Sequence, residues 1–328
     1  GRTQGALRMT REWWKHMVLI LGALIVLAPF YMMVSYSFKS PGEIDRGEGG
    51  FFGRQEIMID PRCVALRQPD RADIEAARSR FPGQDDAGVQ AALLAETEAT
   101  CSMRPVAFNY TKAFTEAPLM RYLLNGVIVT VSIFLIQIVV ALPAAYALAK
   151  LKFWGREAVF GLVLFCLLIP VHAIALPLYI LLAKLGLTNT YAALVVPWTI
   201  SVFGIFLMRQ FFMTVPDDLI DAARMDGMSE FAIVWRVMLP TAIPALLAFA
   251  IFSIVAHWND YFWPRLVVTG NRDLFTPPLG LREFKGDGDG SFFGPMMATA
   301  TVIVTPLIVA FLIAQRRFIE GITLSGMK

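Results

Sequence analysis

The sequence predicts an all-α membrane protein with six transmembrane helices and an extracytoplasmic insert between the first and second spans. Three observations support this fold class. Hydrophobic residues make up 56% of the 328 residues and charged residues 17%, and the mean hydropathy is +0.58, so the chain is more apolar than a soluble domain. The apolar residues are gathered in blocks, each close to the roughly 20 helical residues that cross a hydrocarbon core. One long polar segment interrupts these blocks.

The predicted spans are windows of apolar residues with few charges. In chain order they cover residues 14–38, 120–149, 158–182, 191–212, 242–262 and 296–315. Several contain Pro or Ser, which transmembrane helices tolerate where neighbours satisfy the backbone. The first span follows a basic segment, as a signal peptide would. Its apolar run of about 25 residues is longer than a typical signal sequence, and no small-residue cleavage site precedes Lys39. We therefore expect a retained anchor.

Basic residues set the expected orientation. They gather in the segments that six alternating spans place on one side of the membrane: Arg2, Arg8, Arg11, Lys15, Lys150, Lys152, Arg156, Arg209, Arg224, Arg236, Arg316 and Arg317. The short loop on the other side, residues 183–190, contains Lys184 alone. By the positive-inside rule, both termini and the loop at 213–241 are expected in the cytoplasm. The net charge of +3 is small, so no nucleic-acid partner is expected.

Residues 39–118 form the polar insert, which has turn signals such as Pro82-Gly83. The expected topology places this insert in an oxidising compartment, where cysteines can pair. Cys63 and Cys101 both lie in it. We expect a disulfide between them; two free thiols are the alternative.

The sequence lacks the common motifs of covalent and nucleotide chemistry. It contains no GxxxxGK[ST] phosphate loop, no HExxH, no CxxC and no Gly-x-Ser-x-Gly elbow. The histidines His16, His172 and His257 are far apart in the sequence, so no metal site is expected. We expect neither an enzyme nor a cofactor bound by this chain.

The loop at 213–241 contains the most specific pattern. A proline and two acids favour a helix start, Gly227 favours a left-handed helix stop, and Ser229 is placed to cap a second helix. The pattern therefore predicts two short helices with a turn between them. The small side chains of Ala222 and Ala223 would let another protein approach the first helix closely, and Ala223 is expected to face such a partner.

The residues of this loop follow a pattern with fixed spacing. Asp221-Ala222-Ala223 is followed after three residues by Gly227, after nine more by Val237, and after one more by Leu239-Pro240. The pattern resembles the EAA loop of ABC-importer permeases, which has Glu in place of Asp221 and Ile in place of Val237. In that family the loop forms a coupling helix that docks in a groove of a cytoplasmic ATPase subunit. The resemblance implies an ATPase-coupling site made of Asp221, Ala222, Ala223, Asp226, Gly227, Leu239 and Pro240.

Two further stretches are similar to carbohydrate-importer permeases. The WN-x-x-x-WP segment of those proteins resembles the run from Trp258 to Pro264, which reads WNDYFWP. The tail of their maltose-type G subunits is similar to residues 321–328. The insert at 39–118 is longer than in that subunit type, so no role for it carries over.

The resemblance implies a subunit of an importer in the bacterial inner membrane. The chain would pair with a second homologous permease within the membrane lipid, and a periplasmic binding protein would deliver the solute. Two cytoplasmic ATPase subunits would bind ATP and Mg. The expected segments are 1–38 for the cytoplasmic N-terminus and first span, 39–118 for the periplasmic insert, 119–316 for a five-helix core with its coupling loop at 213–241, and 317–328 for a cytoplasmic tail.

Polar groups within spans are the candidates for a substrate pathway. They are Gln137, His172, Ser201, Asn259 and Asp260. His172 follows Pro170 in a span with two prolines, which suggests unwound backbone facing a cavity. For Asn259 and Asp260 a place in the interfacial aromatic belt is an alternative.

The resemblance implies a sugar or sugar derivative as the substrate. A glycerol-phosphate or polyol importer permease is the alternative within the family, and a secondary transporter is the alternative from another class. A secondary transporter would need ionisable residues deep inside the spans or inverted repeats, and neither is clear in the sequence.

We predict that Cys63 and Cys101 are cross-linked in the protein isolated from its membrane. Mass spectrometry of peptides prepared without reduction should find the linked pair. Free thiols that react with an alkylating agent at both positions would contradict this prediction.

Overall fold

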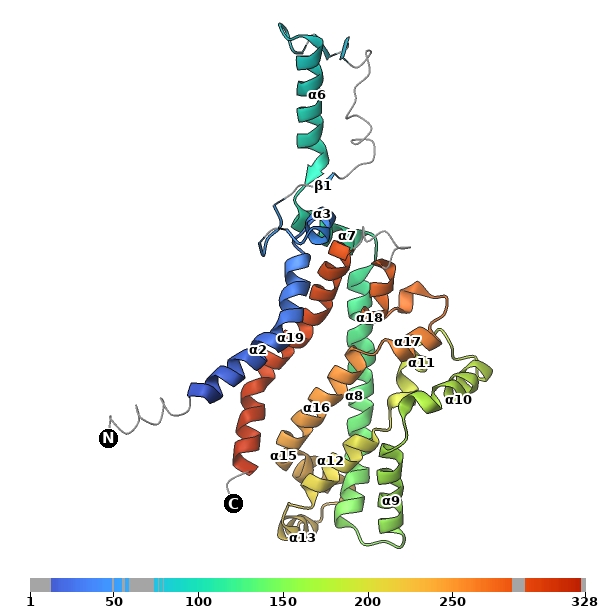
Figure 1. Cartoon of the computed structure of the whole chain (residues 1–328). Coiled ribbons are helices and arrows are strands. Elements are labelled where there is room, and N and C mark those ends of the chain that lie inside the picture. The colour runs from blue at the N-terminus through green and yellow to red at the C-terminus, as the bar shows by residue number, and fades with distance from the viewer. Residues whose placement is uncertain are drawn as a thin grey trace, which may run out of the picture. The chain divides into compact units, whose positions relative to one another are not determined.

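The computed structural model describes residues 13–48, 50–54, 57–58, 74–75, 77–78, 80–284 and 293–325. The chain divides into two compact units, of which the first comprises residues 1–117 and 283–302 and the second residues 118–282 and 303–328. Helices dominate the described part of both units (Figure 1). The sheet found there consists of two strands of two residues each. The all-α prediction is therefore confirmed for the described residues apart from this short pair.

The second unit is built around the helix α8 (Leu119–Lys150) (Figure 1). Many of its buried residues recur at intervals of three and four, so one face of the helix is turned inward: Gly126, Val129, Ile133, Gln137, Ala141, Ala145 and Leu148. The helices α12 (Val202–Phe212) and α16 (Ile243–Trp258) both pack against α8. This three-helix packing is the centre of the unit.

Shorter elements surround these three helices. They are α9 (Arg156–Leu167), α10 (Val171–Lys184), α11 (Tyr191–Val195), the 3-10 turn η1 (Val196–Trp198), α13 (Asp217–Met225), α14 (Glu230–Ile233), the π-helix η2 (Val234–Met238), α15 (Leu239–Thr241), α17 (Phe262–Val267), η3 (Arg272–Leu274) and α18 (Pro277–Gly280). The turn η4 (Leu281–Phe284) and the helix α19 (Phe293–Ser325) each contain residues of both units.

The described residues include four helical stretches that are long and apolar enough to cross a membrane: Trp13–Tyr36, Leu119–Lys150, Tyr191–Phe212 and Phe293–Ile313. Two further helix pairs pass the same test together but are bent. One is α9 with α10, at 98°, and the other is the stretch Glu230–Thr241 with α16, at 86°. The predicted number of six spans is reached if each bent pair is one span. The side of the membrane on which each loop lies stays a prediction.

The third predicted span, residues 158–182, is not one continuous helix. α9 ends at Leu167, and α10 begins at Val171, directly after Pro170. Proline has no N–H to donate to the preceding turn, and its ring disfavours helical backbone in the residue before it. The break therefore follows from Pro170, whereas Pro177 is accommodated inside α10.

The first unit contains the insert and the helix before it. Its elements are α2 (Trp13–Tyr36), α3 (Pro41–Asp45), β1 (Ile57–Met58), α6 (Asp86–Cys101), β2 (Ser102–Met103) and α7 (Pro105–Thr115). The two strands pair antiparallel, with Ile57 opposite Met103. Cys101 is the last residue of α6, and Cys63 lies outside the described residues. The expected disulfide therefore stays a prediction.

Two buried polar side chains hold the start of the insert in place within the first unit. The carboxylate of Glu43 accepts hydrogen bonds from the backbone N–H of Ser40 at 3.0 Å and of Arg54 at 2.6 Å. The side-chain amide of Asn109, in α7, donates to two backbone carbonyls, among them that of Lys39 at 3.0 Å. Because buried polar groups are costly unless they are hydrogen-bonded, these contacts fix the loop after α2 against α7.

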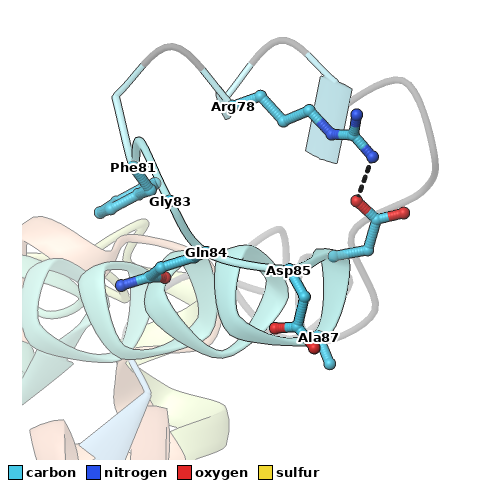
Figure 2. Close-up of a pocket in the computed structure, with 7 residues that line it drawn as sticks. Arg78, Phe81, Gly83, Gln84, Asp85 and Ala87 are labelled. Atoms are coloured by element: carbon cyan, nitrogen blue, oxygen red, sulfur yellow. Dashed lines mark hydrogen bonds and ion pairs between the residues drawn. The ribbon is translucent and has the colours of Figure 1, made fainter.

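The turn before α6 confirms one of the predicted turn signals, because Gly83 has a φ of +89°. Asp85 then accepts a hydrogen bond from the backbone N–H of Gly88 at 2.9 Å, and Arg78 forms an ion pair with Asp86 (Figure 2). These residues line an open hollow on the surface. The charged side chains of Asp85, Asp86 and Arg78 make contacts within the turn itself.

The helix α2 makes almost no contact with a protein core. Ser35 is the one residue of α2 that is buried, and apolar side chains such as Leu19, which is 69% exposed, cover its surface. A long helix that is apolar on all sides belongs in lipid or against other membrane helices. This agrees with the prediction that the first span is a membrane helix.

We predict that Gly126→Ala destabilises the second unit by about 1–3 kcal/mol, the usual cost of overpacking a core. A Cβ at Gly126 would lie 2.6 Å from Cγ of Pro277 and 3.2 Å from the ring of Trp258, and the proline ring cannot rotate away. The melting temperature of the purified protein in detergent should fall. Gly161→Ala is the matched control, because a Cβ there meets no atom within 4 Å. Equal melting temperatures for the two variants would contradict the prediction.

Candidate functional site

The loop at 213–241 begins with a helix that is tied to the end of α8. The helix α13 starts where predicted, with Asp217 as its first residue, but Pro216 is its N-cap and does not lie in its first turn. The ammonium group of Lys150, in α8, donates to the carboxylate of Asp217 and to the backbone carbonyl of Val215, both at 2.6 Å. The hydrogen bond from Lys150, and next the positive charge of Lys150, lower the pKa of the Asp217 carboxyl. The start of α13 is therefore held to α8 by a charged contact.

The predicted turn after this helix is confirmed at Gly227, whose φ is +78°. The N–H of Gly227 donates to the carbonyl of Arg224 at 2.9 Å, and the N–H of Met228 donates to that of Ala223 at 3.0 Å. These bonds satisfy the free carbonyls at the end of α13. The hydroxyl of Ser229 then accepts the N–H of Ala232 at 3.2 Å, so Ser229 caps α14 as predicted.

The expectation that Ala223 faces a partner protein is wrong. Ala223 is 5% exposed and lies in a cluster of this chain's own buried side chains: Leu142, Ala145, Tyr146, Met208, Phe212, Val215, Ile220, Ile233, Val234, Met238 and Ala242. Ile220 and Ala223 are three residues apart and share the inward face of α13. The outward face of the loop instead presents Leu219, Ala222, Met225 and Phe231, with Met225 88% exposed.

A second charged contact joins the turn to α8. The guanidinium of Arg224 donates to the carboxylates of Glu230 at 2.8 Å and of Asp221 at 3.0 Å. The hydroxyl of Tyr146, in α8, donates to Glu230 at 2.5 Å. The pKa of the Glu230 carboxyl is lowered mainly by the hydrogen bond from Arg224 and next by that from Tyr146. Asp226 is exposed and is the C-cap of α13.

The second helix of the loop is less regular than predicted. α14 continues into the π-helix η2, and α15 then starts at Leu239 and contains Pro240. We attribute the π-helix to Pro240, because its missing N–H and its ring disturb the hydrogen bonds of the preceding turn. Leu239 packs against the core that contains Ala223, whereas Pro240 is exposed.

A second candidate site is a cavity of about 530 Å³ within the second unit. Four predicted pathway residues line it: Gln137, His172, Ser201 and Asp260. His172 is exposed and lies in the first turn of α10, directly after the broken backbone rather than within it. The hydroxyl of Ser201 accepts the N–H of Gly204 at 3.0 Å and so also caps α12.

The structure does not place Asn259 with the other pathway residues. Its side chain is exposed and donates to the carbonyl of Val255 at 2.9 Å, at the end of α16. The predicted fifth span, residues 242–262, therefore stops as a helix at Trp258, and α17 is a separate element. This places Asp260 at the cavity and turns its neighbour Asn259 away from it.

The side-chain amide of Gln137 bonds to several groups at the cavity. It is 3% exposed. Its oxygen accepts the hydroxyl of Ser253 at 2.6 Å, and its nitrogen donates to the backbone carbonyl of Trp198 at 2.7 Å. The Nε2 atom of His257 lies 3.3 Å from the same nitrogen. Sequence reasoning did not assign Ser253 and His257 to this site, although their spacing of four residues on an apolar helix was a signal.

Aromatic rings form much of the remaining wall. The ring of Trp198 stands edge-on to that of Trp263 with 5.6 Å between centroids, and His172 packs on Phe262 at 4.6 Å. The indole N–H of Trp263 donates to the carbonyl of Ala193 at 2.9 Å. That of Trp198 is buried and has no hydrogen-bond partner among the described residues. The cavity thus combines aromatic surface with a few polar groups, as ligand sites commonly do.

Comparison with known proteins identifies the family. The family model described as "Binding-protein-dependent transport system inner membrane component" matches residues 137–323, more than half of the chain. This chain belongs to that family. The resemblance to ABC-importer permeases that the loop indicated is therefore confirmed, and the alternative of a secondary transporter is not.

Two relatives of known name are similar to this chain over about two thirds of its length. The arabinooligosaccharides transport system permease protein AraQ of Halalkalibacterium halodurans is 37% identical over 221 residues, which are 67% of this chain and 78% of that protein. The sn-glycerol-3-phosphate transport system permease protein UgpE of Shigella flexneri is 33% identical over 207 residues, or 63% of this chain and 73% of that protein. Both relatives are named as permease proteins of transport systems.

A solved structure shares the fold. It is a crystal structure of a bacterial ABC transporter involved in the import of the acidic polysaccharide alginate. The TM-score is 0.70 at 18% sequence identity, and the match covers 97% of this chain and 98% of that chain. At this identity the likeness concerns the fold alone. The family and the several apolar helices make this chain a multi-pass inner-membrane protein.

We predict that the contact of Glu230 with Arg224 makes stability depend on pH. The pKa of Glu230 is lower in the folded state than its ordinary value of about 4.3. The contact therefore contributes its full stabilisation at any pH above that ordinary value, and the stabilisation is lost as the pH falls through the lowered pKa. The side chain of Glu230 is 44% exposed, so we expect only about 0.5 kcal/mol.

The measurement is the fall in melting temperature between neutral and acidic pH, which should be smaller in Glu230→Gln than in the wild type. Glu157→Gln is the control, because its carboxylate pairs with the adjacent Arg156 and is 69% exposed. A Glu230→Gln variant with the full wild-type pH dependence would contradict the prediction.

Proposed function

We propose that the loop at 213–241 docks on a cytoplasmic ATPase subunit and couples it to a solute pathway in the second unit. The observation that carries this proposal is the pair of charged contacts between the loop and α8. Lys150 bonds to Asp217, and Tyr146 bonds to Glu230, so a force applied to α13 is transmitted to α8. The same helix contributes Gln137 to the cavity.

The outward face of the loop is the proposed docking surface. Leu219, Ala222, Met225 and Phe231 are exposed, whereas the opposite face of α13 is buried in this chain's own core. Leu219, Ala222 and Met225 recur at intervals of three and so share one face of α13, and apolar side chains gathered on an exposed face mark a contact surface. Within the proposed coupling site, Ala222 is in contact with the partner, while Ala223, Leu239 and Gly227 shape the loop that presents it.

The transport cycle that we propose needs other subunits. A second homologous permease completes the pathway, two ATPase subunits bind ATP and Mg, and a periplasmic binding protein delivers the solute. ATP on one side and the loaded binding protein on the other then bias the same two-state pathway. The chain itself supplies walls and linkage, and contributes no ATP site.

The proposed topology follows the positive-inside rule. Both termini lie in the cytoplasm, with residues 1–38 as the N-terminus and first span and 317–328 as the tail. Residues 39–118 form the periplasmic insert, and 119–316 form the permease core. The charged loop contacts described above lie on the cytoplasmic side in this topology.

The proposed substrate is a sugar or a sugar derivative. The name of one relative supports this class, since AraQ belongs to an arabinooligosaccharides transport system. The pathway residues are Gln137, His172, Ser201 and Asp260, which share one cavity. Glycerol phosphate stays the second candidate, because UgpE is similar to this chain over a comparable length.

We predict that Ala222→Glu and Gly227→Val both uncouple transport from ATP hydrolysis. Glutamate in place of Ala222 puts a charge on the docking surface. The turn requires a positive φ at residue 227, and this conformation costs a β-branched residue such as valine about 1–2 kcal/mol or more. Stimulation of ATP hydrolysis by the loaded binding protein should fall about fivefold or more, a loss within the usual range of coupling energies.

Ala222→Ser is the matched control, because it keeps a small side chain at the same position and should retain stimulation. Copurification of the second permease shows that the variants still assemble. Ala223→Glu is a poor test, since it would bury a charge in this chain's own core. Wild-type stimulation in both Ala222→Glu and Gly227→Val would refute the docking proposal.

A further inference from the structure

The side chains that line the cavity of the second unit include few charged groups. Among the described residues that line it there is no Lys or Arg, and Asp260 is the one acidic side chain. The carboxylate of Asp260 accepts the backbone N–H of Trp263 at 3.1 Å, which holds it at the start of α17. A solute in this cavity therefore meets a carboxylate and no fixed positive charge from this chain.

The rest of the wall suits a sugar ring. Phe262, which is 43% exposed, and the half-buried Trp198 offer aromatic surface on which the apolar C–H face of a sugar can pack. His172 and Ser201 offer polar atoms for hydroxyl groups. Within the described part of the chain the buried indole N–H of Trp198 has no hydrogen-bond partner, and a buried donor left unsatisfied in this way calls for an explanation such as a functional role.

We infer that this cavity receives one uncharged sugar unit of the solute, and that Asp260 disfavours solutes with phosphate or carboxylate groups. The inference rests on the proposed function, and it decides between the two substrate classes that the relatives leave open. It also gives this permease a selective step of its own, after the choice made by the binding protein.

The physical basis is the charge of the wall. An anion bound there needs a positive partner, but the described wall has no Lys or Arg and carries the carboxylate of Asp260. A sugar hydroxyl remains neutral and can donate a charge-assisted hydrogen bond to that carboxylate. The same residue therefore favours one class of solute and repels the other.

The experiment uses the complete complex, with the partner permease and the ATPase subunits, in lipid nanodiscs without ATP. Saturation-transfer NMR detects weak binding directly, and so it bypasses the binding protein. The two probes, used separately at millimolar concentration, are arabinotriose and sn-glycerol 3-phosphate. We expect saturation of arabinotriose and none of glycerol 3-phosphate in the wild type.

Two variants change the charge of the wall. Asp260→Asn keeps the shape and an acceptor for Trp263, and it should weaken arabinotriose binding about tenfold, the cost of losing a charged hydrogen-bond partner. Ile200→Lys adds a cation at a cavity residue that is 65% exposed, and it should allow glycerol 3-phosphate to bind. Ile200→Gln is its uncharged control, and Asn259→Ala is a control outside the cavity.

Three results would overturn the inference: no saturation of arabinotriose in the wild type, saturation of glycerol 3-phosphate as strong as that of arabinotriose, or unchanged preferences in both charge variants. ATP-driven uptake adds a fourth such result: uptake of glycerol 3-phosphate by the wild type would refute the selective step and leave the proposed function standing. A complex in which no loaded binding protein stimulates ATP hydrolysis would refute the function itself.

Discussion

The buried amide of Gln137 is the contact on which the arrangement of the second unit depends. A polar group in the middle of an apolar helix has few partners, and leaving it unsatisfied would cost about 1–3 kcal/mol. Gln137 meets this requirement with Ser253 from α16 and the backbone carbonyl of Trp198 from η1. Three elements that are far apart in the sequence are thereby held in one position, and the wall of the cavity follows from it.

The same helix joins this network to the loop at 213–241. One end of α8 is bonded to that loop through Tyr146 and Lys150, and Gln137 lies on the same helix at the cavity. The two sites are therefore connected through one continuous helix, which contains Pro143 between them. Close-packed neighbours then favour a few discrete arrangements over continuous bending, which is what a coupled pathway requires.

The first helix of the loop, its turn and the cap of the second helix could be predicted from the sequence, whereas the π-helix η2 could not. Pro216, Gly227 and Ser229 act on the backbone within a few residues, through a fixed φ, a positive φ and a side-chain cap, so their effect needs no distant partner. The direction of Ala223 could not be predicted in the same way. Whether Ala222 or Ala223 faces inward depends on how α13 lies on the core, and that core includes residues of α8 and α12.

The sequence by itself determined the apolar spans, the turn at Gly227 and the family, because hydropathy, backbone preference and motif spacing are properties of short stretches of chain. Only the tertiary structure decided that Pro170 breaks the third span by 98°, that Asp260 joins Gln137 and His172 at one cavity, and that Asn259 does not. Neighbours in sequence can point in opposite directions at the end of a helix. Their place is set by contacts between distant elements, for which the sequence contains no local signal.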